Sequence, residues 1–267
     1  MAATLLAVPV LICGASTTVG RQIAHNLLDE GGEVRLFSVG DVAALRQQGA
    51  FVSHGTWDDE GRLEAALTDV HTLVFVPHGL AWPADRISAA AKVCATAATN
   101  AGVKRVIMVS ALGASRSCEP HRVALAQAER HLALVPAPTL IMRSNLVQSP
   151  RLIDALLTAD LDGLDEVIVT PITVDDVAAL VVAYDQARAD SRDGTLVVRC
   201  EGTTAMPFGA YRNALRQRYG AQGRVGRRLL SPSETSALQM FIADGFQDDD
   251  ADVDGFALAG LHPSTTV

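Results

Sequence analysis

Lysine and tyrosine are scarce in this chain of 267 residues, and their positions exclude one common catalytic device. Only two of the 22 basic residues are lysines, Lys92 and Lys104. The three tyrosines, Tyr184, Tyr211 and Tyr219, lie in the last third of the chain, and no lysine follows any of them by four positions. The chain therefore has no Tyr-x-x-x-Lys motif, in which a lysine assists a tyrosine that donates a proton to the substrate.

Cysteine is also rare, and long apolar runs are missing. The scattered cysteines show neither the spacing of a metal site nor that of a disulfide framework: Cys13, Cys94, Cys118 and Cys200. No apolar run reaches the roughly 18 residues that a membrane span needs. Residues 1–14 are apolar, lack a basic residue and run into a glycine turn, so we interpret them as a buried strand rather than a signal peptide. We expect a cytoplasmic protein with no metal site and no membrane partner.

The overall composition indicates a globular chain. Hydrophobic residues make up 49%, charged residues 19% and aromatic residues 4% of the sequence. The net charge of −8 argues against a nucleic-acid partner, which normally requires a basic face. The length suits one large domain, or a core domain with a smaller lobe attached.

Short β-branched runs alternate with helical patterns over residues 8–143. The predicted strands are residues 8–13, 33–38, 50–54, 71–77, 104–110 and 139–143. The predicted helices are residues 21–30, 41–48, 59–67, 87–101 and 119–134. Such alternation predicts right-handed crossovers and a parallel sheet. We therefore expect an α/β fold, a Rossmann-like doubly wound parallel sheet, with its ligand crevice near the turn after the first strand.

The second half of the chain has a looser pattern. It contains a strand at 167–173, a helix at 175–187, a strand at 195–199 and helices near 208–219 and 233–243. We predict a Rossmann-like domain over residues 1–150 and a smaller substrate-binding lobe over 151–267, which can include segments that return to the sheet. Two charge clusters are interpreted as solvated surface, or alternatively as a partner surface: Arg212, Arg216, Arg218, Arg224, Arg227 and Arg228, and Asp248, Asp249, Asp250, Asp252 and Asp254.

Several segments, in order along the chain, resemble the NmrA-like family, an atypical branch of the short-chain dehydrogenase/reductase superfamily. They are GASTTVG, EVRLF, HGTWDDEGRLEAAL, AATNAGVKRVIMVSALGA, HRVALAQAERHL, TLIMRSNLVQSP, ITVDDVAALVVA and GFALAGLHPSTT. The resemblance implies a Rossmann domain with a small substrate lobe. It also implies either NAD(P)H-dependent reduction of quinone-like substrates or a dinucleotide-binding regulator without turnover.

The glycine turn departs from the family pattern at its middle position. Gly14 and Gly20 keep the outer roles, but Thr17 stands where a glycine normally lets the pyrophosphate approach the backbone. The turn either binds a dinucleotide, NADP or NAD, or is closed by its own hydroxyl caps. The candidate cofactor-binding residues are Gly14, Ser16, Thr17, Thr18, Val19, Gly20, Arg35 and Ser38.

The resemblance also locates the remaining candidate site residues. The family lysine on the helix after the fifth strand corresponds to Leu125, which cannot donate a proton. Ser110 ends the fifth strand, and His78 and His121 are candidate general bases. Candidate substrate-binding residues, mostly apolar, suit a flat hydrophobic ligand: Trp82, Leu112, Met142, Asn145 and Met206. Trp57 either stacks on a ligand ring or fills space at the sheet edge.

Three hypotheses for function follow. The first is an NmrA-like protein that binds a small aromatic or quinone-like molecule, in secondary metabolism, without Tyr-Lys hydride chemistry and with isomerase or lyase activity if it is an enzyme. The second is an NAD(P)H-dependent quinone or enone reductase. The third is a non-enzymatic redox-sensing regulator with a protein partner. A homodimer is compatible with each hypothesis.

Overall fold

A parallel sheet of eight strands forms the centre of the computed structural model, which describes residues 8–57, 59–77, 83–187, 194–220, 230–246 and 253–264. The strands are β1 Val10–Cys13, β2 Val34–Ser38, β3 Phe51–His54, β4 Thr72–Phe75, β5 Arg105–Ala111, β6 Thr139–Ser144, β10 Thr195–Cys200 and β12 Val253–Asp254. Their order across the sheet is β12-β10-β6-β5-β4-β1-β2-β3, and every neighbouring pair is parallel.

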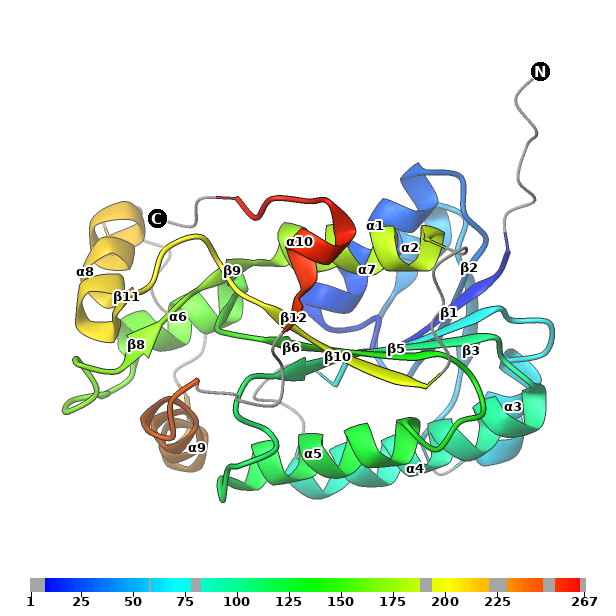
Figure 1. Cartoon of the computed structure of the whole chain (residues 1–267), viewed down its shortest axis with the longest axis horizontal. Helices are drawn as coiled ribbons and strands as arrows, with labels where there is room; N and C mark the ends of the chain where they lie inside the picture. Colours follow the sequence, from blue (N-terminus) through cyan, green and yellow to red (C-terminus); the bar gives the residue numbers. More distant parts are fainter. Residues whose placement is uncertain are drawn as a thin grey trace.

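Helices cover both faces of this sheet (Figure 1). One face carries α1 Thr18–Asp29, α2 Ala43–Gln47, α7 Val174–Gln186 and α10 Gly255–Ala259. The other carries α3 Glu60–Ala66, α4 Ala84–Ala101 and α5 Pro120–Leu132. Because both faces are covered, the central strands β1, β4 and β5 are buried along their whole length, which explains their nearly unbroken apolar sequences.

The strand order reverses at β1. The chain runs outward through β2 and β3, then returns to place β4 on the other side of β1. In doubly wound sheets, ligands bind at the carboxyl ends of the strands beside such a reversal. The predicted fold class, a Rossmann-like doubly wound parallel sheet, is confirmed.

A separate apolar core lies beyond the carboxyl ends of the strands. It is built from α6 Pro150–Thr158, α8 Phe208–Tyr219 and α9 Pro232–Ala243, together with β8 Ile168–Val169 and its antiparallel partner β11 Met206–Pro207. A further short pair, β7 Val147–Gln148 and β9 Ile172–Thr173, leads into and out of this lobe. The single strand expected at 167–173 is instead two strands in two small sheets, with Pro171, which lacks an N–H donor, between them.

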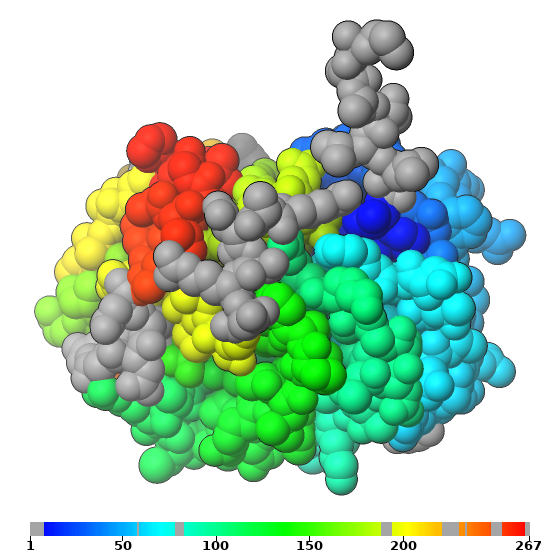
Figure 2. All heavy atoms as spheres, turned by 45° about the vertical axis from the view of Figure 1, so that its right-hand side comes forward, coloured from blue at the N-terminus to red at the C-terminus, as the bar shows by residue number. Residues whose placement is uncertain are grey.

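The C-terminal half is divided between the lobe and the main sheet. Helix α7 packs against α1, and β10 pairs with β6. The last described residues, red in Figure 2, lie on the surface against α7 and β10. There the Ser264 backbone N–H and hydroxyl both donate to the Asp176 carboxylate, at 3.0 and 2.8 Å. The end of the chain therefore stabilises the N-terminus of α7.

The described residues include neither a candidate membrane span nor a candidate metal cluster. None of the helices there is long and apolar enough to cross a membrane. Within the same residues, no group of three or more His, Cys, Asp or Glu side chains is arranged to hold a metal ion.

The turn after β1 gives the first testable prediction. Gly14 has φ +102°, and an added Cβ would lie 2.2 Å from the Val76 carbonyl oxygen. Gly49 has φ +109° with nothing within 4 Å of such a Cβ, so it is a control for backbone strain alone. We expect Gly49→Ala to lower the free energy of unfolding by about 1–2 kcal/mol. Gly14→Ala should lower it by about 3–5 kcal/mol, because the clash adds to the strain.

Urea denaturation of the two variants measures this difference. Equal losses for Gly14→Ala and Gly49→Ala would show that the close approach to Val76 is not a constraint on the fold.

Candidate functional site

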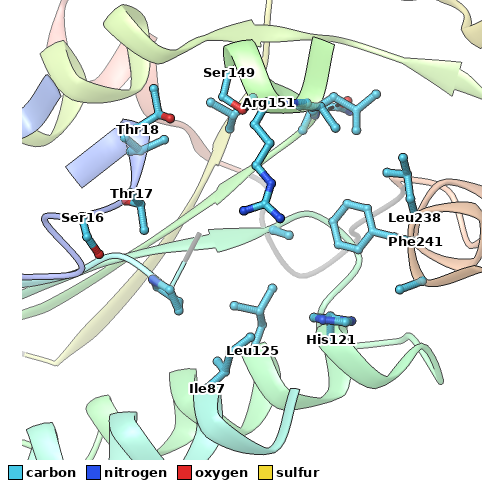
Figure 3. Close-up of a pocket in the computed structure, with 18 residues that line it drawn as sticks. Ser16, Thr17, Thr18, Ile87, His121, Leu125, Ser149, Arg151, Leu238 and Phe241 are labelled. Carbon is cyan, nitrogen blue, oxygen red and sulfur yellow. Dashed lines mark hydrogen bonds between the residues drawn. The ribbon is translucent and has the colours of Figure 1, made fainter. Parts of the chain in front are cut away.

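A cavity of about 310 Å³ lies at the carboxyl ends of β1, β4, β5 and β6, between the sheet and the lobe (Figure 3). Its sheet side is formed by the glycine turn, Pro77, Ala111 and Asn145. Helices α4 and α5 contribute Ile87, His121 and Leu125. The lobe side consists of residues from β7, α6 and α9: Leu146, Val147, Ser149, Arg151, Leu152, Ala237, Leu238 and Phe241.

The glycine turn aims the N-terminus of α1 at this cavity. The Thr17 hydroxyl donates to the Gly14 carbonyl oxygen at 2.8 Å and accepts from the Gly20 N–H at 3.0 Å. Thr17 is thus the N-cap of α1. A Cβ on Gly20 would lie 2.4 Å from the Gly14 carbonyl oxygen, so the last glycine is required for the helix to pack on the turn. Ser16, Thr17, Thr18 and Val19 all line the cavity.

The loop after β2 packs against this turn. Ser38 is buried, and its hydroxyl accepts from the Gly40 N–H at 3.1 Å. Arg35 lies toward the other end of β2, where it pairs with Glu33 at 3.0 Å and donates to the Thr68 carbonyl oxygen. The structure therefore does not bring Arg35 to the cavity. It brings Arg21 to the loop after β2 instead, where its Nη2 donates to the Asp41 carbonyl oxygen at 3.3 Å.

His121 is the ionisable side chain that α5 presents to the cavity. Glu119 is the N-cap of α5, and its carboxylate accepts from the backbone N–H groups of His121 and Arg122 at 3.0 and 2.9 Å. The same carboxylate lies 3.1 Å from His121 Nδ1. Burial raises the pKa of Glu119, but these hydrogen bonds and the charge of His121 outweigh it and hold the pKa below its ordinary value of 4.5. The ionised carboxylate favours a proton on Nδ1 of the His121 ring.

Ser110 belongs to a buried polar network rather than to the cavity wall. Its hydroxyl donates to Glu129 Oε1 at 2.5 Å, and Ser110 itself is fully buried. Arg143 binds the same carboxylate through two nitrogens, at 3.1 Å to Oε1 and 2.7 Å to Oε2. This network connects β5, β6 and α5 directly behind the strand ends that form the cavity.

The other predicted site residues are distributed as follows. Asn145 lines the cavity, and its side-chain oxygen accepts from the Leu146 N–H at 2.8 Å. Leu112 and Met206 pack in the core of the lobe, and Met142 packs in the core on the α1 side of the sheet. His78 and Trp82 lie outside the described residues, as do Arg224, Arg227, Arg228, Asp248, Asp249, Asp250 and Asp252 of the charge clusters.

Trp57 and Arg212, which the sequence also singled out, have structural contacts away from the cavity lining. Trp57 packs against Phe37 and Phe75, with ring centroids at 5.7 and 6.3 Å, so it fills space beside the sheet. Arg212, one of the clustered arginines, is buried and donates to the Leu156 and Ala159 carbonyl oxygens, both at 3.0 Å. It therefore stabilises the C-terminal end of α6.

The cavity residues contributed by α6 and α9 were not among the candidates predicted from the sequence. A signal for α6 was present, because Ser149 followed by Pro150 is a typical helix start, and Ser149 indeed accepts from the Leu152 N–H at 3.2 Å. That start places Arg151 in the first turn of the helix. No local signal could show that α9 faces the sheet, because this contact depends on long-range packing.

A family model described as NAD(P)H-binding matches residues 14–188, most of the chain and all of the turn just described. The chain belongs to this NAD(P)H-binding family. No curated protein sequence matches it. The assignment agrees with the position of the glycine turn at the reversal of strand order.

Solved structures share the fold at low sequence identity. Citrobacter sp. triphenylmethane reductase complexed with NADP(H) has a TM-score of 0.74 and 16% identity, over 97% of this chain and 96% of that chain. A nucleoside-diphosphate-sugar epimerase from Staphylococcus aureus gives 0.74 and 15%, over 96% and 97%. The dTDP-glucose 4,6-dehydratase from Streptomyces venezuelae, with NAD bound, gives 0.71 and 17%, over 97% and 92%. These likenesses show the fold alone.

The buried network gives the second prediction. Arg143→Met leaves the Glu129 carboxylate buried without its cation, so the free energy of unfolding should fall by about 3–5 kcal/mol. Combining it with Glu129→Leu removes both charges and should recover part of that loss. Chemical denaturation of the single and double variants measures both effects. A double variant whose loss equals the sum of the two single losses would contradict an interaction between these side chains.

The Glu119 cap gives a pH-dependent prediction. Because its pKa is lower in the folded than in the unfolded chain, ionised Glu119 stabilises the fold above about pH 4.5, and this stabilisation disappears as the pH falls through the folded-state pKa. The free energy of unfolding should therefore exceed that of Glu119→Gln by about 1 kcal/mol at neutral pH and approach it in acid. A difference that stays constant from neutral to acidic pH would contradict this role.

Proposed function

We propose that this protein is an NAD(P)H-dependent reductase whose acceptor is a flat, apolar molecule such as a quinone or a conjugated enone. One observation carries the proposal: a single cavity joins the glycine turn of an NAD(P)H-binding family to an apolar wall made by Ile87, Leu125, Leu238 and Phe241. Such a cavity accommodates the reactive end of a dinucleotide and a hydrophobic acceptor side by side.

The turn fits a dinucleotide despite Thr17. The Thr17 hydroxyl points back to Gly14 and Gly20, so it satisfies the turn and not a ligand. The next two backbone N–H groups, of Thr18 and Val19, lie in the first helical turn, where they have no intrahelical acceptor and can bind a phosphate. Arg21 contacts the loop after β2, and we propose that it binds a ribose 2′-phosphate there, so NADPH should bind more tightly than NADH.

The site supplies a proton donor other than a tyrosine. A bound reduced nicotinamide supplies a hydride, and the acceptor then needs a proton at the oxygen that gains charge. We propose that the protonated ring of His121, which Glu119 orients through Nδ1, gives that proton to the acceptor. Quinones and enones are electron-poor and need little acid assistance, which is consistent with Leu125 in place of a lysine.

The similarity to known proteins is consistent with this proposal, which rests on the cavity. Triphenylmethane reductase, a protein of the same fold, is named for an aromatic acceptor and was solved with NADP(H). The sequence segments that resemble the NmrA-like family suggest the same class of acceptor. A cofactor-independent isomerase or lyase is the second candidate. It is favoured by Leu125, which lines the cavity at the position where the NmrA-like family has a lysine that can bind the ribose.

Turnover under anaerobic conditions tests the proposal. With naphthoquinone as acceptor, the purified protein should oxidise NADPH. The reaction is measured as the loss of absorbance of the reduced nicotinamide. His121→Gln should lower kcat by about 10- to 100-fold, below the usual range for general acids because the acceptor needs little assistance. His131→Gln, in the last turn of the same helix and outside the cavity lining, is the matched control and should leave kcat unchanged.

The competing candidate predicts the opposite result. Binding of naphthoquinone without oxidation of NADPH or NADH would exclude the reductase and favour cofactor-independent chemistry. Loss of kcat in both histidine variants would show that His121 acts through the stability of α5 and not through proton donation.

A further inference from the structure

The lobe places a cation inside the apolar cavity. Arg151 lies in the first turn of α6, whose start is fixed by Pro150 and by the Ser149 cap. Figure 3 shows its guanidinium extending from α6 into the space between Thr17 and Phe241. The side chain keeps 42% of its surface exposed, so a ligand can reach it.

We propose that Arg151 binds an acidic group on the substrate, so that the reductase acts on flat acceptors carrying a carboxylate, sulfonate or similar oxyanion. The inference deepens the proposed function and rests on it. It names the chemical class of substrate for the same cavity, which the apolar wall alone leaves undefined.

The hydrogen bonding of Arg151 leaves most of its donors for such a group. One nitrogen, Nη2, donates to Glu234 Oε1 at 3.2 Å. The other Glu234 oxygen accepts from the Ser231 N–H at 2.8 Å in the capping box of α9. A guanidinium has five N–H donors, and no other partner of Arg151 is found in the described part of the chain. Glu234 therefore orients Arg151 without saturating it, and an edge remains for bidentate contact with an oxyanion.

The charges around the cavity point to an anionic ligand. The described lining includes no Asp or Glu, and His121 is its other ionisable side chain. Two other lobe-facing arginines are used structurally: Arg122 pairs with Asp244 at 2.8 Å, and Arg212 binds the carbonyl oxygens at the end of α6. Arg151 differs from both because its side chain faces a cavity and not a packed interior. Beyond its single contact with Glu234, the guanidinium has donors beside apolar walls, and a ligand that brings its own negative charge satisfies them best.

An aromatic wall next to Arg151 is held rigidly. The Phe241 ring lies 4.3 Å from the guanidinium carbon of Arg122 and packs edge-on against Phe246, with ring centroids 5.7 Å apart. These contacts fix the ring that lines the cavity. The site thus combines a flat apolar surface with a nearby cation, the pattern expected for an aromatic acid.

The same guanidinium chemistry suits a second oxyanion, the pyrophosphate of the dinucleotide. A matched pair of acceptors distinguishes an acidic group on the substrate from the pyrophosphate. Naphthoquinone and naphthoquinone sulfonate share a ring system and differ in charge. Calorimetry with NADPH alone reports directly on the dinucleotide.

The experiment compares Arg151→Met and Arg151→Lys with the wild-type protein. Arg151→Met should raise KM for the sulfonate by roughly 10- to 100-fold, the value of one charge-assisted contact. The KM for naphthoquinone and the Kd for NADPH should change by less than about threefold, and Arg151→Lys should restore part of the sulfonate affinity. Arg130→Met, on α5 and outside the cavity lining, is the control and should change none of these values.

Two results would overturn the inference. Equal changes in KM for both acceptors would mean that Arg151 acts only on the shape of the site. A matching rise in the Kd for NADPH would assign Arg151 to the dinucleotide.

Naphthalene sulfonate, which cannot be reduced, tests the oxyanion site independently of the proposed reductase function. If neither quinone is reduced, tighter calorimetric binding of this probe to wild type than to Arg151→Met still supports an oxyanion site, whereas equal binding rejects it.

Discussion

The close approach of the turn after β1 to the end of β4 is the constraint on which the site depends. At Gly14 the backbone passes so near the Val76 carbonyl oxygen that no side chain fits. This contact lets the chain turn sharply into α1, and Gly20 then brings the helix against the turn. The positive end of α1 consequently points into the space beyond the strands. The Thr17 hydroxyl bonds to the Gly14 carbonyl oxygen and caps the helix, so a threonine at the middle position helps to close the turn.

The lobe turns that open crevice into a cavity, and buried arginines hold it in place. Arg122 of α5 has no exposed surface; it pairs with Asp244 at the end of α9 and lies against the rings of Phe241 and Phe246. Burial lowers the pKa of Arg122, an effect that the Asp244 carboxylate opposes. Two of its nitrogens, Nε and Nη2, have no hydrogen-bond partner in the described chain, and the rings of Phe241 and Phe246 lie against the guanidinium. Helix α9 is thereby attached to α5, the same helix that presents His121, so α5 positions both the proposed proton donor and the apolar wall of the cavity.

The sequence could predict the sheet because its signals are local. Continuous apolar runs such as residues 104–110, the glycines of the turn, and Gly102 as a helix C-cap each report on their own surroundings. Only part of the cavity lining could be predicted, because a site is assembled from segments that are distant in the sequence. His121, Asn145 and the glycine turn lie at strand or helix ends that the topology brings together, whereas Ser110 faces a buried carboxylate on α5 that no sequence spacing reveals. The contribution of α9 depends on packing between distant segments, which single-sequence periodicity does not contain.

Binding of the dinucleotide to the glycine turn is the central claim, and calorimetric titration with NADPH tests it most directly. We predict that the wild-type protein binds NADPH at micromolar concentration. Thr17→Ser should change this affinity little, because it keeps the hydroxyl that caps α1. Absence of binding up to millimolar NADPH or NADH, in a protein whose denaturation curve shows it to be folded, would contradict the account and leave the cavity as a site for a cofactor-independent ligand.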